Sequence, residues 1–373
     1  MKRGITFLAL AALLIFAFSM AHAEKEISLG GKVYAHWYYD LSDSLNAPGN
    51  ISDANFDSYN AFGISRAYLT GSAKLSEKTS GKVTVDVNPN SNDNNIRLKF
   101  AYLKWHFYTG LQFDLTAKLG LHETPWIYGM DKIWGRRYLA KTPTDQLGML
   151  TTSDNGLSFL SNLGEKGKWG SASLSIFNGA SYESPWDNNP SKDINIAAFL
   201  TPLNSKAEFA NSTIGFQYYM GTHNAYDDSS LTKDDYKQTL MSVVANFQYK
   251  KTFALGVEYN SLGFQQPDTS GVMVDNKENS MAIFGTLWFA ELAQNTKMLQ
   301  DLNVFFRYMT DDPDGEDLVN EMSETELIVG LECTPVDGFA ASLNYRADTA
   351  KDLGPGVDDI SNAYLFLNTL FEF

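Results

Sequence analysis

The chain has 373 residues, a formal net charge of −15 and a mean hydropathy of −0.25, and 13% of its residues are aromatic. This acidity excludes nucleic-acid binding, which requires a basic surface. The single cysteine, Cys333, excludes a fold held together by internal disulfides.

Residues 1–23 have the pattern of a secretory signal peptide. Two basic residues precede an apolar run from Ile5 to Phe18, and Ala21-His22-Ala23 provides small residues for cleavage. A retained helical anchor is the alternative, although the run is shorter than the roughly twenty residues of a spanning helix. We expect residues 24–373 to form one domain. It is either exported and soluble or crosses a membrane as strands, because no later apolar run is long enough for a spanning helix.

The mature chain alternates between strand-like segments and connections. About sixteen segments have period-two alternation, an even number, as a closed bacterial barrel requires. These segments lie near Ile27–Asp40, Asn60–Leu75, Lys82–Asn88, Ile96–Tyr108, Leu111–His122, Asn155–Asn162, Lys168–Asn178, Asp193–Leu203, Ser212–Met220, Gln238–Tyr249, Thr252–Ser261, Ser280–Ala290, Leu302–Thr310, Thr325–Thr334, Gly338–Asp348 and Asn362–Phe373.

The connections alternate in length. Short turns are expected at Ser76–Gly81, Tyr108–Gly110, Leu163–Gly167, Lys250–Lys251 and Pro335–Asp337. Long loops are expected at Leu41–Tyr59, Glu123–Asp154, Gly179–Lys192, Gly221–Lys237, Leu262–Asn279, Asp311–Glu324 and Thr349–Ser361. An antiparallel up-and-down barrel explains this alternation, with both chain termini on the side of the short turns. The exception is Glu291–Asp301, which is longer than a turn.

The two faces of the segments differ in polarity. In Ser361–Phe373 one face carries Leu365, Leu367 and Phe371, and the other carries Asn362 and Asn368. Such a strand either meets lipid with its apolar face or packs on a soluble core.

The second strand-like segment decides between these two interpretations. One set is small and apolar, with Ser65 as the exception: Ala61, Gly63, Ala67, Leu69, Gly71, Ala73 and Leu75. The opposite set is polar: Arg66, Tyr68, Thr70, Ser72 and Lys74. Charges buried without partners cost several kcal/mol each, so this face is too polar for a dry core. The sequence therefore predicts a transmembrane barrel with a hydrated interior, which is a channel.

Aromatic residues gather near the strand ends. They are Trp37, Tyr38, Tyr39, Trp105, Phe107, Tyr108, Tyr218, Tyr219, Trp288, Phe289, Phe371 and Phe373. We interpret them as the two interfacial girdles of an outer-membrane barrel, with scattered core aromatics as the alternative.

Basic residues dominate the inward set that parity predicts. The predicted pore-lining residues are Lys32, Arg66, Lys74, Lys82, Lys104, Lys118, Arg307 and Arg346. They are opposed by Asp40, Asp86, Asp114, Glu258, Glu326 and Glu332. An excess of positive charge on a channel wall favours anions. Alternatively, these charges pair across strands and only keep the wall wet.

The longest connection, Glu123–Asp154, is rich in aromatic and basic residues. A loop of this length in a compact barrel is usually functional or disordered. We expect it to fold inward as the third loop and to narrow the pore, with the constriction formed by Lys132, Arg136, Arg137 and Lys141. The alternative is a surface loop that contacts lipopolysaccharide or a neighbouring subunit.

No catalytic, metal or cofactor site is predicted. The acidic stretch Asp311–Asp317 offers oxygen ligands for a divalent cation, but it lacks the spacing of a helix-loop-helix calcium site and favours a solvated surface loop. After cleavage only His36, His106, His122 and His223 remain, and no motif links one of them to a serine nucleophile.

Several short stretches, in this order along the chain, resemble the phosphate-selective porin O and P family. They are Ile64–Leu69, Ala101–Leu103, Gly120–Trp126, Asp154–Leu157, Phe177–Gly179, Lys192–Ile194 and Leu200–Leu203. The resemblance implies a sixteen-stranded, usually trimeric porin in the outer membrane of a Gram-negative bacterium. It also implies contact with lipid and lipopolysaccharide and passage of small anions or other small hydrophilic solutes. The inward basic residues are fewer than the arginine ladder and lysine cluster of the best-studied members. The alternative is a non-conducting structural or adhesive barrel.

Overall fold

The computed structural model describes residues 26–42, 60–88, 95–183, 191–222, 236–267, 273–291, 293, 296–313, 323–351 and 359–373. The expected signal peptide, residues 1–23, lies outside these ranges. Within them, no helix has the length and apolar character needed to cross a membrane.

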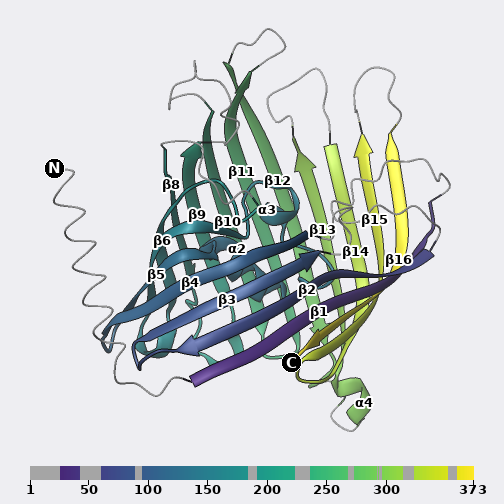
Figure 1. The fold of residues 1–373 in the computed structure, drawn as a ribbon. Helices are drawn as coiled ribbons and strands as arrows, with labels where there is room; N and C mark the ends of the chain where they lie inside the picture. The colour runs from purple at the N-terminus through teal and green to yellow at the C-terminus, as the bar shows by residue number, and fades with distance from the viewer. Residues whose placement is uncertain are drawn as a thin grey trace.

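Sixteen antiparallel strands form one closed barrel, in which sequence neighbours pair and β1 also pairs with β16 (Figure 1). The strands are β1 (Glu26–Asp40), β2 (Asn60–Lys74), β3 (Thr79–Asn88), β4 (Asn95–Thr109), β5 (Asp114–Glu123), β6 (Ser153–Leu163), β7 (Gly170–Phe177), β8 (Asp193–Leu200), β9 (Thr213–Thr222), β10 (Lys237–Tyr249), β11 (Phe253–Pro267), β12 (Met273–Trp288), β13 (Leu302–Asp312), β14 (Ser323–Val336), β15 (Phe339–Lys351) and β16 (Ile360–Glu372). Short helices occupy connections: α2 (Pro125–Trp134), α3 (Pro143–Gln146), η1 (Glu165–Gly167), η2 (Ala207–Phe209) and α4 (Lys297–Gln300). The predicted all-β, sixteen-stranded barrel is confirmed.

The connections divide between the two ends of the barrel. β1 begins and β16 ends at the lower end in Figure 1, which we call the turn end; the opposite end is the loop end. The predicted long loop Leu262–Asn279 is wrong, because β11 and β12 stay paired up to Pro267 and Met273. The polar composition of these strand ends is typical of a loop. In the structure, however, Gln265 of β11 donates a hydrogen bond of 2.8 Å to Asp275 of β12.

β1 and β16 close the barrel near the turn end. Lys32 lies opposite Glu372 in the register. Gly31 and Phe373 exchange two backbone hydrogen bonds, of 2.9 and 3.0 Å. A Cβ atom on Gly31 would lie 2.6 Å from the Phe373 ring, so the glycine leaves room for that ring.

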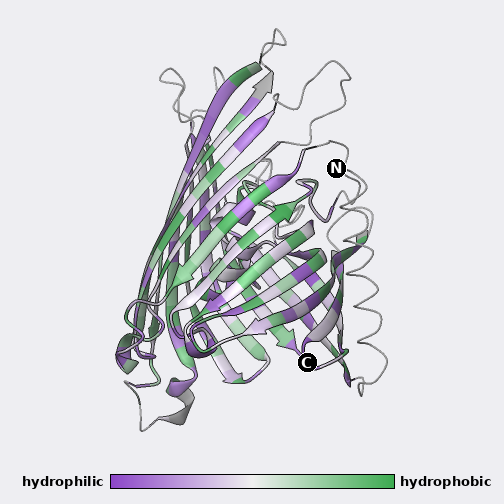
Figure 2. Ribbon diagram, turned by 90° about the vertical axis from the view of Figure 1, so that its left-hand side faces the viewer, coloured by the Kyte–Doolittle hydropathy of each residue, from purple (hydrophilic) through white to green (hydrophobic). Residues whose placement is uncertain are grey.

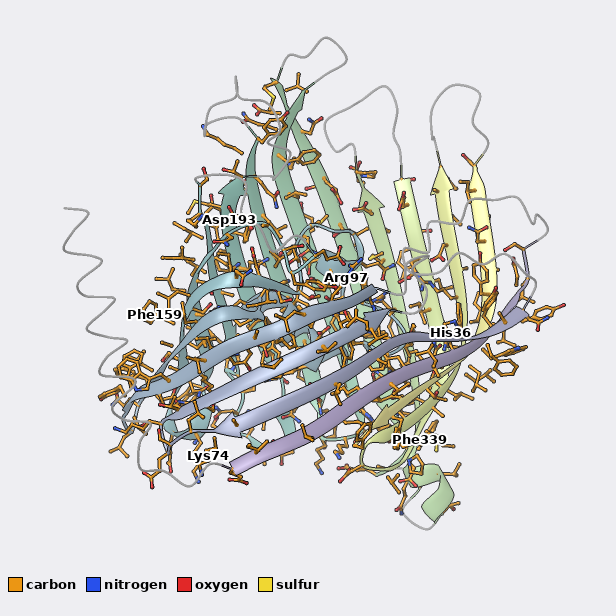
Figure 3. The ribbon with its side chains drawn as sticks, in the orientation of Figure 1. His36, Lys74, Arg97, Phe159, Asp193 and Phe339 are labelled. Atoms are coloured by element: carbon orange, nitrogen blue, oxygen red, sulfur yellow. The ribbon has the colours of Figure 1, made fainter. Side chains whose placement is uncertain are left out.

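The two faces of the barrel wall carry the predicted polarities. In β16, Leu367 and Phe371 are 42% and 54% exposed on the outer surface, whereas Asn362 and Asn368 are buried inside. Figure 2 shows the same alternation of hydrophilic and hydrophobic residues along the strands. Phe159, on the outside in Figure 3, is likewise exposed. The outer surface therefore has the apolar character that lipid requires.

A β-bulge in β2 corrects the predicted facing of two residues. Arg66 pairs with Tyr34 while Ile64 pairs with Ala35, so Ser65 is the extra residue. Before the bulge the outward residues are Phe62 and Ile64, with 85% and 44% exposure, whereas after it Leu69 faces outward. The expectation that Ala61 and Gly63 face lipid is therefore wrong. One inserted residue reverses the facing of every residue before it.

Exposed aromatic residues lie at the turn end, where one of the two predicted girdles belongs. Trp105, Tyr108 and Phe373 are exposed there, and Phe373 lies 5.6 Å from the Phe371 ring. Two residues assigned to the girdles are misplaced, because Tyr38 and Tyr219 are 3% and 6% exposed and face the interior.

The acidic stretch Asp311–Asp317 is only partly described. Asp311 and Asp312 are the last residues of β13, and residues 314–317 lie outside the described ranges. Across the described residues, no group of three His, Cys, Asp or Glu side chains is arranged to hold a metal ion.

Candidate functional site inside the barrel

The third loop, residues 124–152, folds into the barrel and is called here the inward loop. α2 begins with Pro125, whose fixed φ suits the first helical position. It ends at Trp134, and the following Gly135 caps it in the left-handed conformation with a φ of 71°. The Thr124 hydroxyl donates a hydrogen bond of 2.5 Å to the Thr151 carbonyl, which ties the two ends of the loop together. The predicted inward folding is confirmed.

One face of α2 packs on the inner wall of the barrel through an apolar seam. From the helix come Trp126, Ile127, Met130 and Trp134, and from the wall come Tyr219, Leu240, Val244, Leu262, Phe284, Phe305 and Ile328. Trp126 stacks on Phe199 at 5.0 Å, and Trp134 meets Phe305 edge-on at 6.2 Å. Burial of each large side chain contributes about 1.5–3 kcal/mol. The inner wall is therefore apolar where β9 to β14 meet the helix, which the polar inner face predicted from β2 did not indicate.

Arg136 anchors the loop beyond the helix and is 5% exposed. Its guanidinium lies 2.9 Å from the Glu332 carboxylate and donates hydrogen bonds of 2.7 Å to Asn303 and 2.9 Å to Thr286. The Tyr138 hydroxyl donates a hydrogen bond of 2.7 Å to the same carboxylate. Burial lowers the pKa of Arg136 and raises that of Tyr138, and the Glu332 charge raises both. Arg136 thus holds the loop to the wall and does not line open space.

Arg137 lies between two carboxylates of the same loop. Its guanidinium donates hydrogen bonds of 3.0 and 3.1 Å to Asp131 and of 2.6 Å to Asp145. Burial alone lowers the pKa of Arg137, but the two carboxylates hold it well above its usual value. The positive charge of Arg137 is permanent and locally neutralised.

The other two predicted constriction residues behave differently. Lys132 is exposed, its ammonium lies 4.1 Å above the Tyr128 ring, and it has no carboxylate partner among the described residues. Lys141 contributes its backbone carbonyl, which accepts a hydrogen bond from Arg307. Of the four, Lys132 is therefore the one whose charge faces open space.

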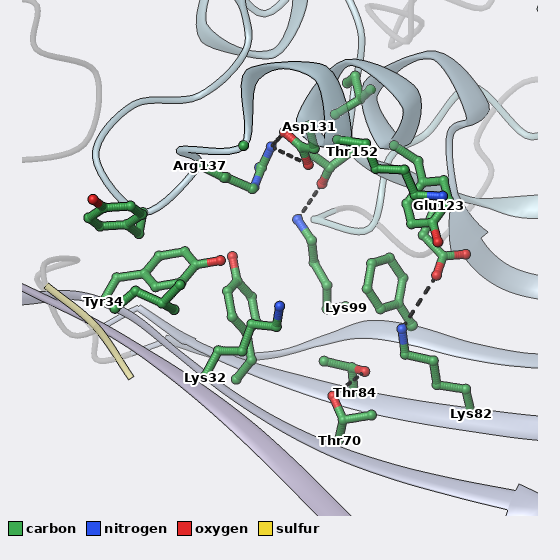
Figure 4. Close-up of a pocket in the computed structure, with 18 residues that line it drawn as sticks. Lys32, Tyr34, Thr70, Lys82, Thr84, Lys99, Glu123, Asp131, Arg137 and Thr152 are labelled. Atoms are coloured by element: carbon green, nitrogen blue, oxygen red, sulfur yellow. Dashed lines mark hydrogen bonds and ion pairs between the residues drawn. The ribbon is translucent and has the colours of Figure 1, made fainter. Parts of the chain in front are cut away.

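A cavity of about 350 Å³ separates α2 from β1 to β5, and we call it the basic chamber (Figure 4). Its charged lining consists of Lys32, Lys82, Lys99, Lys132, Arg137, Glu123 and Asp131. Its aromatic lining consists of Tyr34, Tyr68, Phe100, Tyr128 and Tyr138. Five basic side chains against two acidic ones leave the chamber positively charged.

Glu123 links several groups at the edge of this chamber. Its carboxylate lies 3.4 Å from the Lys82 ammonium and 2.8 Å from that of Lys118, and it accepts a hydrogen bond of 3.2 Å from the Tyr102 hydroxyl. Lys82 also lies 4.6 Å above the Phe100 ring. One carboxylate therefore holds two ammonium groups in place beside aromatic faces.

The remaining predicted pore-lining residues face the interior, and they differ in whether a carboxylate neutralises them. Arg66 pairs with Asp86 at 3.2 Å, and Lys32 pairs with Glu372 at 2.8 Å. Lys104 lies directly opposite Lys118 in the register, and Lys74 is exposed at the turn end.

On the far side of the interior, two arginines share one carboxylate. Arg307 and Arg346 lie 2.5 and 2.6 Å from Glu326, and Arg346 lies 3.3 Å from Asp348. Most of the predicted basic residues are thus paired within the wall.

Parity counting misses Lys99, which lines the chamber and is 4% exposed. The register shifts between Thr84, which pairs with Phe100, and Val85, which pairs with Leu98. Lys99 is the inserted residue, so it faces inward although simple alternation places it toward lipid. The available signal was the charge itself, because a lysine on a lipid-facing position is costly.

Comparisons with known proteins agree with this architecture. No protein-family model matches the sequence, and no curated protein sequence matches it. The outer-membrane channel DcaP of Acinetobacter baumannii is similar over 95% of this chain and 99% of its own, with a TM-score of 0.61 and 13% identity. An anion-selective porin from Comamonas acidovorans is similar over 94% of this chain and 100% of its own, with a TM-score of 0.56 and 12% identity. In-vitro-folded OmpT, an outer-membrane protein of Vibrio cholerae, is similar over 95% of this chain and 99% of its own, with a TM-score of 0.58 and 11% identity. At these identities the likeness shows a shared fold.

Proposed function

We propose that this protein is an outer-membrane porin of a Gram-negative bacterium, a water-filled channel for passive diffusion of small hydrophilic solutes. The observation that carries the proposal is the closed sixteen-stranded barrel with an apolar outer surface and a charged cavity inside. The similarity in fold to an outer-membrane channel and an anion-selective porin supports it. The function needs no catalytic group, and its partners are the solutes, the surrounding lipid and lipopolysaccharide.

We further propose that small anions, such as phosphate, are preferred. The basic chamber has more lysine and arginine side chains than carboxylates, and such a wall raises the local concentration of anions. Lys132 is the strongest candidate for direct contact because its ammonium is exposed and has no carboxylate partner among the described residues. Lys82 and Lys32 line the same chamber and would extend the path of the anions along the barrel wall.

A homotrimer is the proposed assembly. The structural neighbours include a trimer form of OmpT from Vibrio cholerae, which has the same barrel fold.

A closed, non-conducting barrel is the second candidate, and the apolar seam favours it. The inward loop packs on β9 to β14 and also reaches the opposite wall, where Tyr138 and Tyr34 share one apolar cluster with Ala340. A loop fixed at both walls could block the interior.

Single-channel recording in a planar bilayer distinguishes the two candidates. We expect conductance steps and a reversal potential, in a salt gradient, that indicates anion preference. Lys132→Glu should shift that potential toward cation preference, whereas Lys168→Glu, at an exposed lysine in a turn-end connection, should leave it unchanged. The absence of conductance steps would exclude a channel, and cation preference in the unmodified protein would exclude the anion proposal.

A further inference from the structure

A second cavity, of about 400 Å³, lies at the loop end between α3 and the inner face of β12 to β16. We call it the acidic pocket. Its charged lining consists of Glu278, Asp311, Glu324, Glu326, Asp348 and Arg346. Acidic side chains outnumber basic ones five to one in this lining, the reverse of the basic chamber.

Three of the carboxylates come from adjacent strands. Asp311 of β13 is the direct register partner of Glu324 of β14. Ser280 of β12 is the register partner of Asp311, which places Glu278 on the same face and diagonally opposite Asp311. Like charges directly opposite one another in a sheet are destabilising. The arrangement therefore calls for a counter-charge.

Asp311 is the carboxylate that most needs a positively charged partner. The residue is 4% exposed, and its Oδ1 atom has no hydrogen-bond partner within the described residues. A buried carboxylate oxygen without a partner costs several kcal/mol in the folded protein. The Asp311 side chain lines the acidic pocket, so a ligand held in the pocket would lie beside this carboxylate.

The nearby arginines do not supply the missing charge. Arg307 and Arg346 are engaged with Glu326, and Arg346 also contacts Asp348. These two arginines balance Glu326 and Asp348. Among the described residues, no ion pair is formed by Glu278, Asp311 or Glu324. In the sequence, the adjoining segments 313–322 and 352–359 contain acidic residues but neither lysine nor arginine.

We propose that the acidic pocket binds a small organic cation with one or two protonated amines, held by Asp311, Glu324 and Glu278. An ammonium group offers three hydrogen-bond donors and can bridge Asp311 and Glu324, which lie directly opposite each other. A second ammonium on the same ligand can contact Glu278 at a separate point. A metal ion fits the site less well, because no three acidic or metal-ligating side chains of the described chain are arranged around one point. A cavity of about 400 Å³ also exceeds the space that a single bare ion fills.

The test is isothermal titration calorimetry of the full-length barrel in a non-ionic detergent, with 1,4-diaminobutane as the probe. We expect one binding site, weakened by added salt, and no heat from uncharged 1,4-butanediol. Asp311→Asn and Glu324→Gln should each weaken binding by about tenfold or more, because each removes a charge-assisted hydrogen bond. Glu208→Gln, which neutralises an exposed carboxylate in the turn-end helix η2, should bind as the unmodified protein does.

Three results would overturn the proposal. The first is an unmodified protein that does not bind the diamine. The second is an Asp311→Asn variant that binds the diamine as tightly as the unmodified protein does. If Asp311→Asn does not fold, unchanged affinity in Glu324→Gln has the same meaning. The third is tight Mg²⁺ or Ca²⁺ binding that excludes the diamine, which would assign the pocket to a metal. Calorimetry does not require conduction, so a non-conducting barrel would leave this result interpretable.

Discussion

Three basic residues of the inward loop show that residue type alone does not define a role. Arg136 and Arg137 are both committed to carboxylates, the first on the barrel wall and the second within the loop. Lys132 projects into the basic chamber. The sequence identified the loop and its basic content, but the carboxylate that neutralises Arg136 comes from Glu332, far along the chain. Which lysine or arginine stays unpaired depends on such distant partners, so the sequence cannot reveal it.

Removal of the Arg136 side chain should destabilise the barrel. Arg136→Ala leaves Glu332 buried without its counter-charge, and the loss of one partner of a buried ion pair costs about 3–5 kcal/mol. Lys132→Ala, at an exposed residue, should change stability by no more than about 0.5 kcal/mol. Urea unfolding of the refolded barrel, followed by tryptophan fluorescence, measures both. Equal midpoints for the two variants would show that the Arg136 pair contributes nothing.

At the scale of elements, the alternation of polar and apolar residues predicted nearly every strand. It failed where a strand carries an extra residue. The bulges at Ser65 and Lys99 each reverse the facing of the residues on one side. A prediction from strict alternation does not detect the inserted residue and assigns those residues to the wrong face. It also failed at the ends of β11 and β12, where paired polar residues have the composition of a loop.

The α2 helix should control the width of the interior through its apolar face. Trp134→Ala removes a side chain that is 3% exposed and packs on Phe284 and Phe305, at a cost of about 3–5 kcal/mol. If the proposed channel conducts, we expect larger and noisier single-channel currents, because the helix would detach from the wall. Trp169→Ala, at a tryptophan that is 47% exposed in the turn-end connection between β6 and β7, is the matched control and should leave the noise unchanged. Identical currents in both variants would contradict a role for the seam.

At the scale of the whole molecule, the two cavities have opposite charge and lie at different heights. The acidic pocket is formed at the loop-end termini of β13 and β14, whereas the basic chamber extends toward Lys32 and Leu370, nearer the turn end. The sequence shows acidic loops and inward lysines, but it does not show their separation along the barrel axis. That separation depends on where the inward loop divides the interior.

An open channel with this charge distribution should conduct unequally in its two directions. The ratio of currents at equal and opposite voltages should differ from one, and it should approach one in the double variant Asp311→Asn/Glu324→Gln, which removes two charges from the acidic pocket. Planar-bilayer recordings of channels inserted in one orientation measure this ratio. A symmetric current in the unmodified protein would contradict the expectation.

The pairing of β1 with β16 also bears on how the barrel assembles. Every other strand pair is contiguous in sequence, so its hairpin can form with little loss of chain entropy, whereas this pair joins segments separated by most of the chain. The pair has the highest contact order in the molecule and should be the last to form. Substitutions such as Gly31→Val, which crowd Phe373, should therefore slow the final step of refolding and prolong the lifetime of an intermediate with two unpaired edges. Such an intermediate is the species most exposed to misassembly and degradation.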